Sequence, residues 1–240
     1  MKKLTVAIQY ECFTSFRYIW IFYLVQYLIV ALICLIVAVG TGSFENIGTN
    51  CLELNTFIYV GILGALGFKE DFKMLIQNGF TRRYIFLATL SLFVFITGIM
   101  SLVDTIVGNV LHFIFPGYST LFGSLYGYGH FLANWLWLLL LYMIVCSLFY
   151  LCILAISRLG KTGSICLGLV LGGGILAAAA LIRFGLSDHM VTALSRALLK
   201  AMGFMNDGTI IFFPPLLTFL ILTCLLCAGS YLIIRRAELN

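Results

Sequence analysis

Few residues of this 240-residue chain have the type and spacing that chemistry requires. Gly160, Lys161 and Thr162 resemble the end of a phosphate-binding loop, in which backbone N–H groups and a lysine hold phosphate. Such a loop also needs a glycine five residues before Gly160 and a preceding strand, but position 155 is alanine at the end of an apolar run. We therefore expect that the chain does not bind ATP by this route.

Histidines and cysteines give no stronger signal. His130 and Asn134 lie one helical turn apart, but no paired glutamates on another apolar stretch supply further ligands and a base, so we expect a capping or interfacial role for His130. Cys224 and Cys227 form a C-x-x-C pair inside an apolar stretch without further ligands at metal-binding spacing. The sequence predicts no catalytic residue and no metal site.

Asp104 is the one acid that could lie within the membrane. A charged group there costs about 2.5–3.5 kcal/mol, so Asp104 would need a partner, for which Arg183 is a candidate, or a water-filled path. The alternative, which we favour, is that Asp104 marks the outer end of its span. A proton-coupled carrier is expected to hold several such groups, so a single acid argues against that function.

The elements around these residues follow from composition. The chain is 62% hydrophobic and 10% charged, with a mean hydropathy of +1.12, which is too apolar for a water-exposed surface. A span needs about 20 apolar residues, and no stretch alternates as barrel strands do. We predict an all-α, multi-pass protein of the cell membrane with six spans, over 18–39, 54–68, 84–103 or further to 115, 131–156, 164–182 and 210–234.

Basic residues predict the orientation, because they gather in cytoplasmic segments. Both termini are expected in the cytoplasm, and the net charge of +5 then reflects topology, with no nucleic-acid partner. Of the fourteen Lys and Arg residues, the outer segments hold three, namely Arg183, Arg196 and Lys200. The inner segments hold the other eleven: Lys2, Lys3, Arg17, Lys69, Lys73, Arg82, Arg83, Arg158, Lys161, Arg235 and Arg236.

The whole chain, 1–240, is expected to form one transmembrane domain. Residues 1–16 lack the features of a cleavable signal and favour an amphipathic helix on the inner membrane surface, the alternative being a frayed tail. The uncharged, tyrosine-rich segment 116–129 is expected at headgroup depth. We expect residues 184–208 to form an outer helix that is capped by Ser187 or Asp188 and ends at Gly203. This helix lies either on the membrane surface or within the outer leaflet. Pro214-Pro215 is expected to interrupt the chain afterwards.

Segment 69–83, KEDFKMLIQNGFTRR, predicts a short amphipathic helix in the cytoplasm. Acidic residues suit its first turn, Asn78-Gly79 ends it, and Thr81 caps the next helix. The alternative is an interfacial helix that only anchors the loop. The apolar face consists of Phe72, Leu75 and Ile76.

Two glycine-rich stretches predict close helix packing, against other spans or another subunit, because small residues let helix backbones approach. The first lies in the second predicted span and holds Gly61, Gly64 and Gly67. The second lies in the fifth and includes Gly168 and Gly172.

The cytoplasmic segment resembles a pattern found in permease subunits of six-helix, type-2 ABC exporters from Gram-positive bacteria. The resemblance implies a dimeric permease in which residues 69–78 form a coupling helix on a separate ATPase subunit and 184–208 form an outer hairpin. ATP and Mg would be bound by that partner, and no cofactor by this chain. The residues that carry the resemblance are Glu70, Asp71, Phe72, Lys73, Gly79, Thr81, Arg82 and Arg83, with a weaker match at Arg235, Arg236 and Ala237.

The expected function is ATP-driven export rather than catalysis. An apolar, aromatic lining suits amphipathic peptides, such as antimicrobial or cytolytic ones, or lipid-like molecules. A secondary carrier or an intramembrane enzyme, each without an ATPase partner, is the alternative, but the chain has no visible repeated halves and no convergent acids or histidines.

Overall fold

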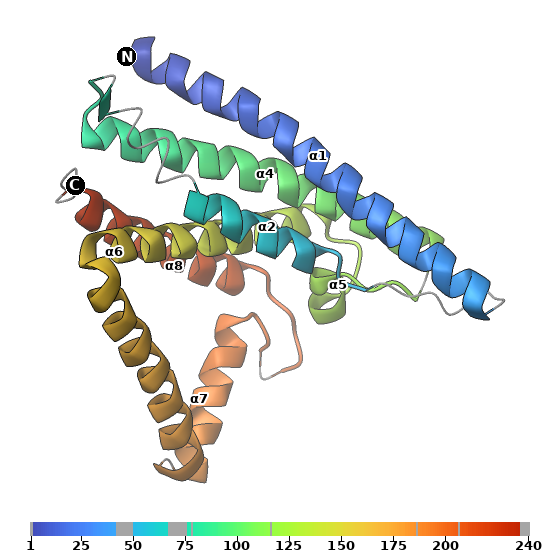
Figure 1. Ribbon diagram of the computed structural model, residues 1–240. Coiled ribbons are helices and arrows are strands. Elements are labelled where there is room, and N and C mark those ends of the chain that lie inside the picture. Colours follow the sequence, from blue (N-terminus) through green and yellow to red (C-terminus); the bar gives the residue numbers. More distant parts are fainter. Residues whose placement is uncertain are drawn as a thin grey trace.

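The structure, a computed structural model, describes residues 2–41, 50–66, 76–77, 79–115, 117–185, 187–205 and 207–235 (Figure 1). Within these ranges the chain is helical, and the one β contact is an isolated bridge between Phe204 and Ile210. The all-α prediction is therefore confirmed. The elements are α1 (Lys2–Thr41), α2 (Glu53–Leu66), α4 (Arg82–Ile114), α5 (Leu121–Tyr126), α6 (Phe131–Ala180), the π-helix η1 (Leu181–Gly185), α7 (Asp188–Ala201) and α8 (Phe213–Arg235).

Four helical segments of the described chain are long and apolar enough to cross a membrane: Cys12–Gly40, Arg82–Ile114, Phe131–Gly160 and Phe213–Arg235. The chain is thus a membrane protein with four candidate spans. The second predicted span corresponds to α2, whose 14 residues reach about 21 Å, less than the hydrocarbon core of about 30 Å.

α1 and α4 are both longer than a simple span. α1 continues without a break through residue 16, where we expected a separate interfacial helix, and its 40 residues measure about 60 Å. A bilayer with its headgroups is about 45 Å thick, so α1 extends beyond it. α4 runs past Asp104 to Ile114, as the longer version of the third span predicts.

The first half of α6 is the centre of a bundle. It packs against α2, α4 and α8, while α1 packs on α4, so helices far apart in sequence lie side by side (Figure 1). The buried side chains form one cluster, which includes Trp137 and Tyr142 of α6. Leucine, isoleucine and phenylalanine side chains cover the outside of the bundle, as a lipid-facing surface requires.

Two glycines of α2 lie in its contact with α6. A Cβ atom at Gly61 would stand 3.1 Å from the Phe149 ring, and one at Gly64 would overlap the carbonyl oxygen of Cys146. These positions let the two backbones approach. Gly168 and Gly172 differ, because a Cβ atom there would meet nothing within 4 Å. Gly67 lies outside the described residues.

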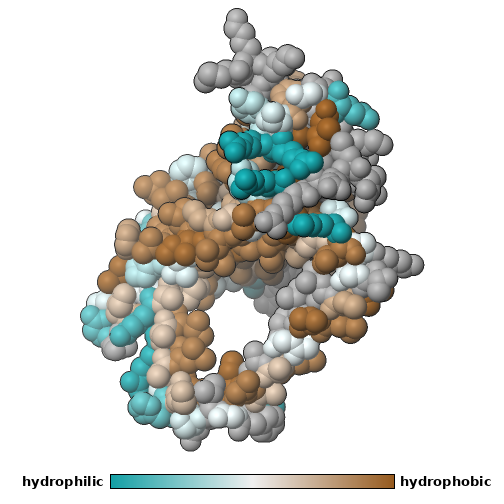
Figure 2. All heavy atoms as spheres, turned by 90° about the vertical axis from the view of Figure 1, so that its left-hand side faces the viewer, coloured by the Kyte–Doolittle hydropathy of each residue, from teal (hydrophilic) through white to brown (hydrophobic). Residues whose placement is uncertain are grey.

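The second half of α6 leaves the bundle. Gly160 has a φ of 68° and a ψ of −174°, which breaks the helix, and the chain then runs outward as an arm, 161–185, before α7 returns toward the bundle (Figure 1). Figure 2 shows an opening between this arm and the bundle, and hydrophobic residues are among those that border it. The predicted fifth span, 164–182, therefore lies on the arm and ends in the π-helix η1, which the sequence did not indicate.

The prediction for 184–208 is partly confirmed. α7 begins after Ser187, whose backbone is extended but whose side chain makes no capping hydrogen bond, and it ends before Gly203, whose φ is +88°. The effect expected of the prolines was wrong. α8 begins at Phe213, so Pro214 and Pro215 occupy its first turn, where a helix does not need their N–H groups.

The α2–α6 contact generates a stability prediction. Gly64→Ala should lower the free energy of unfolding by about 1–3 kcal/mol, because the added methyl group overlaps backbone that cannot rotate away. The matched control, Gly172→Ala, should not destabilise the protein, because the site is open and alanine favours a helix by about 1 kcal/mol. Thermal unfolding in detergent measures both, and equal effects would contradict the assigned contact.

Candidate functional site

The most unusual group of the bundle is the carboxyl of Asp104 on α4. Its residue is 4% exposed and lies well inside the span Arg82–Ile114. The hydroxyl of Tyr142, on α6, is 2.5 Å from one carboxyl oxygen, and that of Tyr23, on α1, is 3.0 Å from the other. α4 continues past Asp104, so this carboxyl is buried within the protein and does not stand at a helix end, while its depth in the membrane stays a prediction.

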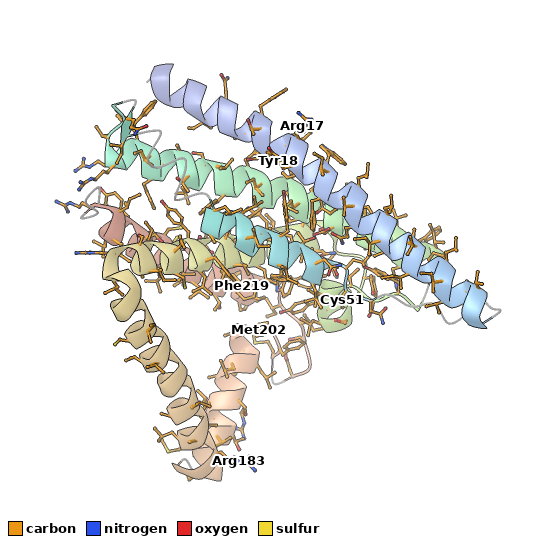
Figure 3. The ribbon with its side chains drawn as sticks, viewed as in Figure 1. Arg17, Tyr18, Cys51, Arg183, Met202 and Phe219 are labelled. Atoms are coloured by element: carbon orange, nitrogen blue, oxygen red, sulfur yellow. The ribbon has the colours of Figure 1, made fainter. Side chains whose placement is uncertain are left out.

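Arg183 is not the partner of Asp104. Figure 3 places Arg183 at the far end of the arm, away from α4. Tyrosine hydroxyls replace the expected arginine, so the carboxyl is held by hydrogen bonds between the three longest helices without a salt bridge. No lysine, arginine or histidine of the described chain is among the groups that act on it.

Local geometry fixes both tyrosines. Met100 and Asp104 lie one turn apart on the same face of α4, and the Tyr23 hydroxyl is 3.0 Å from the Met100 carbonyl oxygen as well as from Asp104. The Tyr23 ring stacks on Tyr27, with centroids 5.7 Å apart, and the Tyr142 ring meets the edge of Phe57 at 5.1 Å. Packing thus holds the two hydroxyls against the carboxyl.

A second buried acid, Glu53, stands at the beginning of α2 and is 2% exposed. The backbone N–H of Leu121, at the start of α5, donates to its carboxylate, while Oε2 has no hydrogen-bond partner. Gly108 of α4 leaves the space for the Thr120 side chain next to this group, since a Cβ there would overlap Thr120 and would stand in ordinary contact, 3.6 Å, with Glu53 Oε1. The fold thus buries a second acid close to the start of α5.

The tyrosine-rich segment covers this end of the bundle, while its expected position at headgroup depth stays a prediction. Tyr118 and Tyr126 are buried, and residues 121–126 form the short helix α5. The Tyr118 hydroxyl accepts from the Leu52 N–H at 3.4 Å, and the Cys51 N–H donates to Ser119 at 2.9 Å. Segment 117–129 therefore packs directly over the start of α2.

Several buried oxygens near the two acids lack partners. Gln26 donates through Nε2 to the Leu52 carbonyl at 3.3 Å, but its Oε1 makes no hydrogen bond. The Thr56 hydroxyl faces the Asp104 carboxyl without a hydrogen bond of good geometry. No group of three or more metal-binding side chains occurs among the described residues. His130 is exposed and its ring lies against Phe212, at 4.7 Å between centroids, which fits the interfacial role expected of it.

The opposite end of the bundle holds the basic residues Arg82, Arg83 and Arg235, and we refer to it as the basic end. The Arg82 guanidinium donates to the Arg235 carbonyl at 2.9 Å, which ties the start of α4 to the last turn of α8. Both chain ends lie on this side in Figure 1, and Figure 2, which faces it, shows hydrophilic side chains gathered there.

The described part of the predicted cytoplasmic segment lies at the basic end. Ile76 and Gln77 are helical, the Gly79 N–H donates to the Ile76 carbonyl at 2.9 Å, and Gly79 has a φ of +77°. This left-handed turn ends the helix at the expected residue. Thr81 is the N-cap of α4 by its backbone, without a side-chain hydrogen bond. The other proposed coupling residues lie outside the described chain: Glu70, Asp71, Phe72, Lys73 and Leu75.

Comparisons with known proteins add no identification. No protein family, curated protein or solved structure matched this chain. The function is therefore inferred from the residues and the geometry described above.

The hydrogen bonds to Asp104 generate a second prediction. Tyr142→Phe should lower the free energy of unfolding by about 1–2 kcal/mol, because the buried carboxyl loses a donor. Tyr59→Phe is the control, since Tyr59 stacks on Phe22 at 4.1 Å through its ring. Thermal unfolding compares the two variants, and a loss no larger in Tyr142→Phe than in Tyr59→Phe would count against the role given to this hydroxyl.

Proposed function

We propose that this chain is the membrane-embedded permease subunit of an ATP-driven exporter of the ABC class, with its basic end in the cytoplasm. ATP and Mg are bound by a separate ATPase subunit, and residues 69–78 transmit the work of that subunit to the helices. The permease acts as a dimer with a second copy of itself. Its cargo is an amphipathic peptide or a lipid-like molecule.

One observation carries the proposal most directly. Arg82 follows the turn at Gly79 by three residues. Its guanidinium donates a hydrogen bond to the Arg235 carbonyl at the end of α8. A force applied to the segment before Gly79 therefore reaches the start of α4 and, through one hydrogen bond, α8. The gathering of Arg82, Arg83 and Arg235 at one end supports a cytoplasmic position, because basic residues favour that side.

The arm supports the dimer and the cargo class. Its apolar side chains are largely exposed, Leu169, Val170 and Leu176 each by about seven-tenths, and Gly168 and the three glycines 172–174 have open space around them. A helix with small residues on a free surface is suited to close contact with another helix. Hydrophobic residues are among those that border the opening beside the arm, which suits an amphipathic or lipid-like molecule over an ion or a sugar (Figure 2).

A secondary carrier without an ATPase is the second candidate, and the buried acids Glu53 and Asp104 favour it. Carriers use buried acids within their spans to bind coupling ions, and the described chain buries two acids, Asp104 within a candidate span and Glu53 at the start of the shorter α2. The intramembrane enzyme is favoured by no group of the described residues.

Copurification discriminates between the two candidates. The tagged chain is extracted from its native membrane with a mild detergent and its partners are identified. An ATPase subunit that copurifies in stoichiometric amount supports the exporter. Transport by the purified chain alone in vesicles, driven by an ion gradient without ATP, would establish the carrier instead.

The coupling segment generates a third prediction. Phe72→Asp should reduce export and retention of the ATPase at least about tenfold, equivalent to about 1.4 kcal/mol of contact energy, because a charge replaces the apolar face of the lever. Leu75→Asp should act in the same way. Binding of the purified ATPase to the variant in nanodiscs measures the loss directly.

Two variants of neighbouring residues control this experiment. Gln77→Asp adds the same charge at an exposed position and should leave binding unchanged. Ile76→Asp should instead lower thermal stability, because Ile76 packs against the buried cluster. Undiminished export by the Phe72→Asp variant would refute the coupling role of residues 69–78.

A further inference from the structure

The hydrogen bonds around Asp104 allow two patterns. The Tyr23 hydroxyl has one proton but lies 3.0 Å from two oxygens, the Met100 carbonyl and Asp104 Oδ1. A carbonyl can only accept. Either Tyr23 donates to an ionised Asp104, or it donates to Met100 and accepts a hydrogen bond from a protonated Asp104. In both patterns Tyr142 donates to Oδ2.

The surroundings of Asp104 favour the neutral pattern. The titratable groups that face it are tyrosine hydroxyls from every neighbouring element and one further acid, Glu53 of α2. Tyrosines stabilise a carboxylate far less than a lysine or arginine does, and a second carboxylate nearby disfavours ionisation of both. The tyrosines are Tyr23 and Tyr27 from α1, Tyr118 from the segment before α5 and Tyr142 from α6.

The neutral pattern also satisfies more atoms. A protonated Asp104 donates from Oδ1 to Tyr23, Tyr23 donates to Met100, and Tyr142 donates to Oδ2, so both carboxyl oxygens, both tyrosine hydroxyls and the Met100 carbonyl have partners and no charge is buried. The ionised pattern leaves a net charge among residues that are at most 4% exposed, within candidate spans. Buried charge without a counter-charge is what membrane interiors disfavour most.

We propose that Asp104 is a proton-binding site. A proton on Oδ1 completes the hydrogen-bonded contact between α1, α4 and α6, which we call the joint. When the proton leaves to water, Tyr23 turns its hydroxyl from Met100 to the carboxylate, and the joint acquires a negative charge. The bundle therefore holds together best with the proton bound. This inference goes beyond the proposed transport function and holds whether ATP or an ion gradient supplies the energy.

Infrared spectroscopy of the protein in nanodiscs tests the proposal. At neutral pH the wild-type protein should show the carbonyl-stretch band of a neutral carboxylic acid, which shifts in D2O. The band should be absent in Asp104→Asn, whose amide has the same shape and can donate to Tyr23 as the acid does. Because this measurement needs neither an ATPase nor a cargo, its failure is distinguishable from failure of the proposed function.

Glu53→Gln is the matched variant, since it neutralises the other buried acid. The band assigned to Asp104 should persist in Glu53→Gln and when Na⁺ is added to the wild type. No band at neutral pH, a band lost in Glu53→Gln but kept in Asp104→Asn, or a band abolished by Na⁺ would each overturn the assignment.

A thermal measurement supplies a second readout of the same site. Unfolding exposes the carboxyl, which then releases its proton, so the wild-type unfolding temperature should fall as the pH rises from mildly acidic to neutral. Asp104→Asn has no proton to release, and this fall should be smaller in the variant. Equal pH dependence of the two proteins would contradict proton binding at Asp104.

Discussion

The carboxyl group of Asp104 is the interaction on which the bundle most depends, because it joins its three longest helices. α1 packs chiefly on α4, and the polar contact between them runs from Tyr23 to Asp104. Tyr142 brings α6 to the same carboxyl. In an apolar environment, where most side chains pack equally well against lipid or protein, a buried polar contact selects one arrangement of helices.

The bundle and the arm differ in how they are stabilised. α2, α4, α8 and the first half of α6 bury a common core, and Gly64 lets α2 approach α6 closely. The arm beyond Gly160 exposes apolar side chains on a helix rich in small residues. A packed bundle linked to an arm with exposed apolar side chains suits a subunit of a larger membrane assembly. The exporter proposal gives each part a role, with the lever at the basic end and the second copy at the arm.

Composition and periodicity were sufficient to predict the helical membrane fold, the extension of α4 and the turns at Gly79 and Gly203. They could not reveal the site. A hydropathy pattern treats Asp104 and Glu53 as interruptions of apolar stretches, which places them at the membrane surface. Asp104 is buried against tyrosines 81 and 38 residues away, and Glu53 lies against Leu121, 68 residues away, and such long-range contacts leave no local signal. The break at Gly160, in contrast, falls in the gap that the sequence predicts between the spans 131–156 and 164–182.

Orientation in the membrane is the claim from which the exporter account proceeds, and cysteine accessibility measures it most directly. In a variant without native cysteines, single cysteines replace Gln77 at the basic end and Asn50 at the opposite end, both of them exposed. A membrane-impermeant maleimide should label the cysteine at position 50 in intact cells and the one at position 77 only after the membrane is opened. Labelling of position 77 from outside the intact cell would contradict the account, because no cytoplasmic ATPase could then reach the lever.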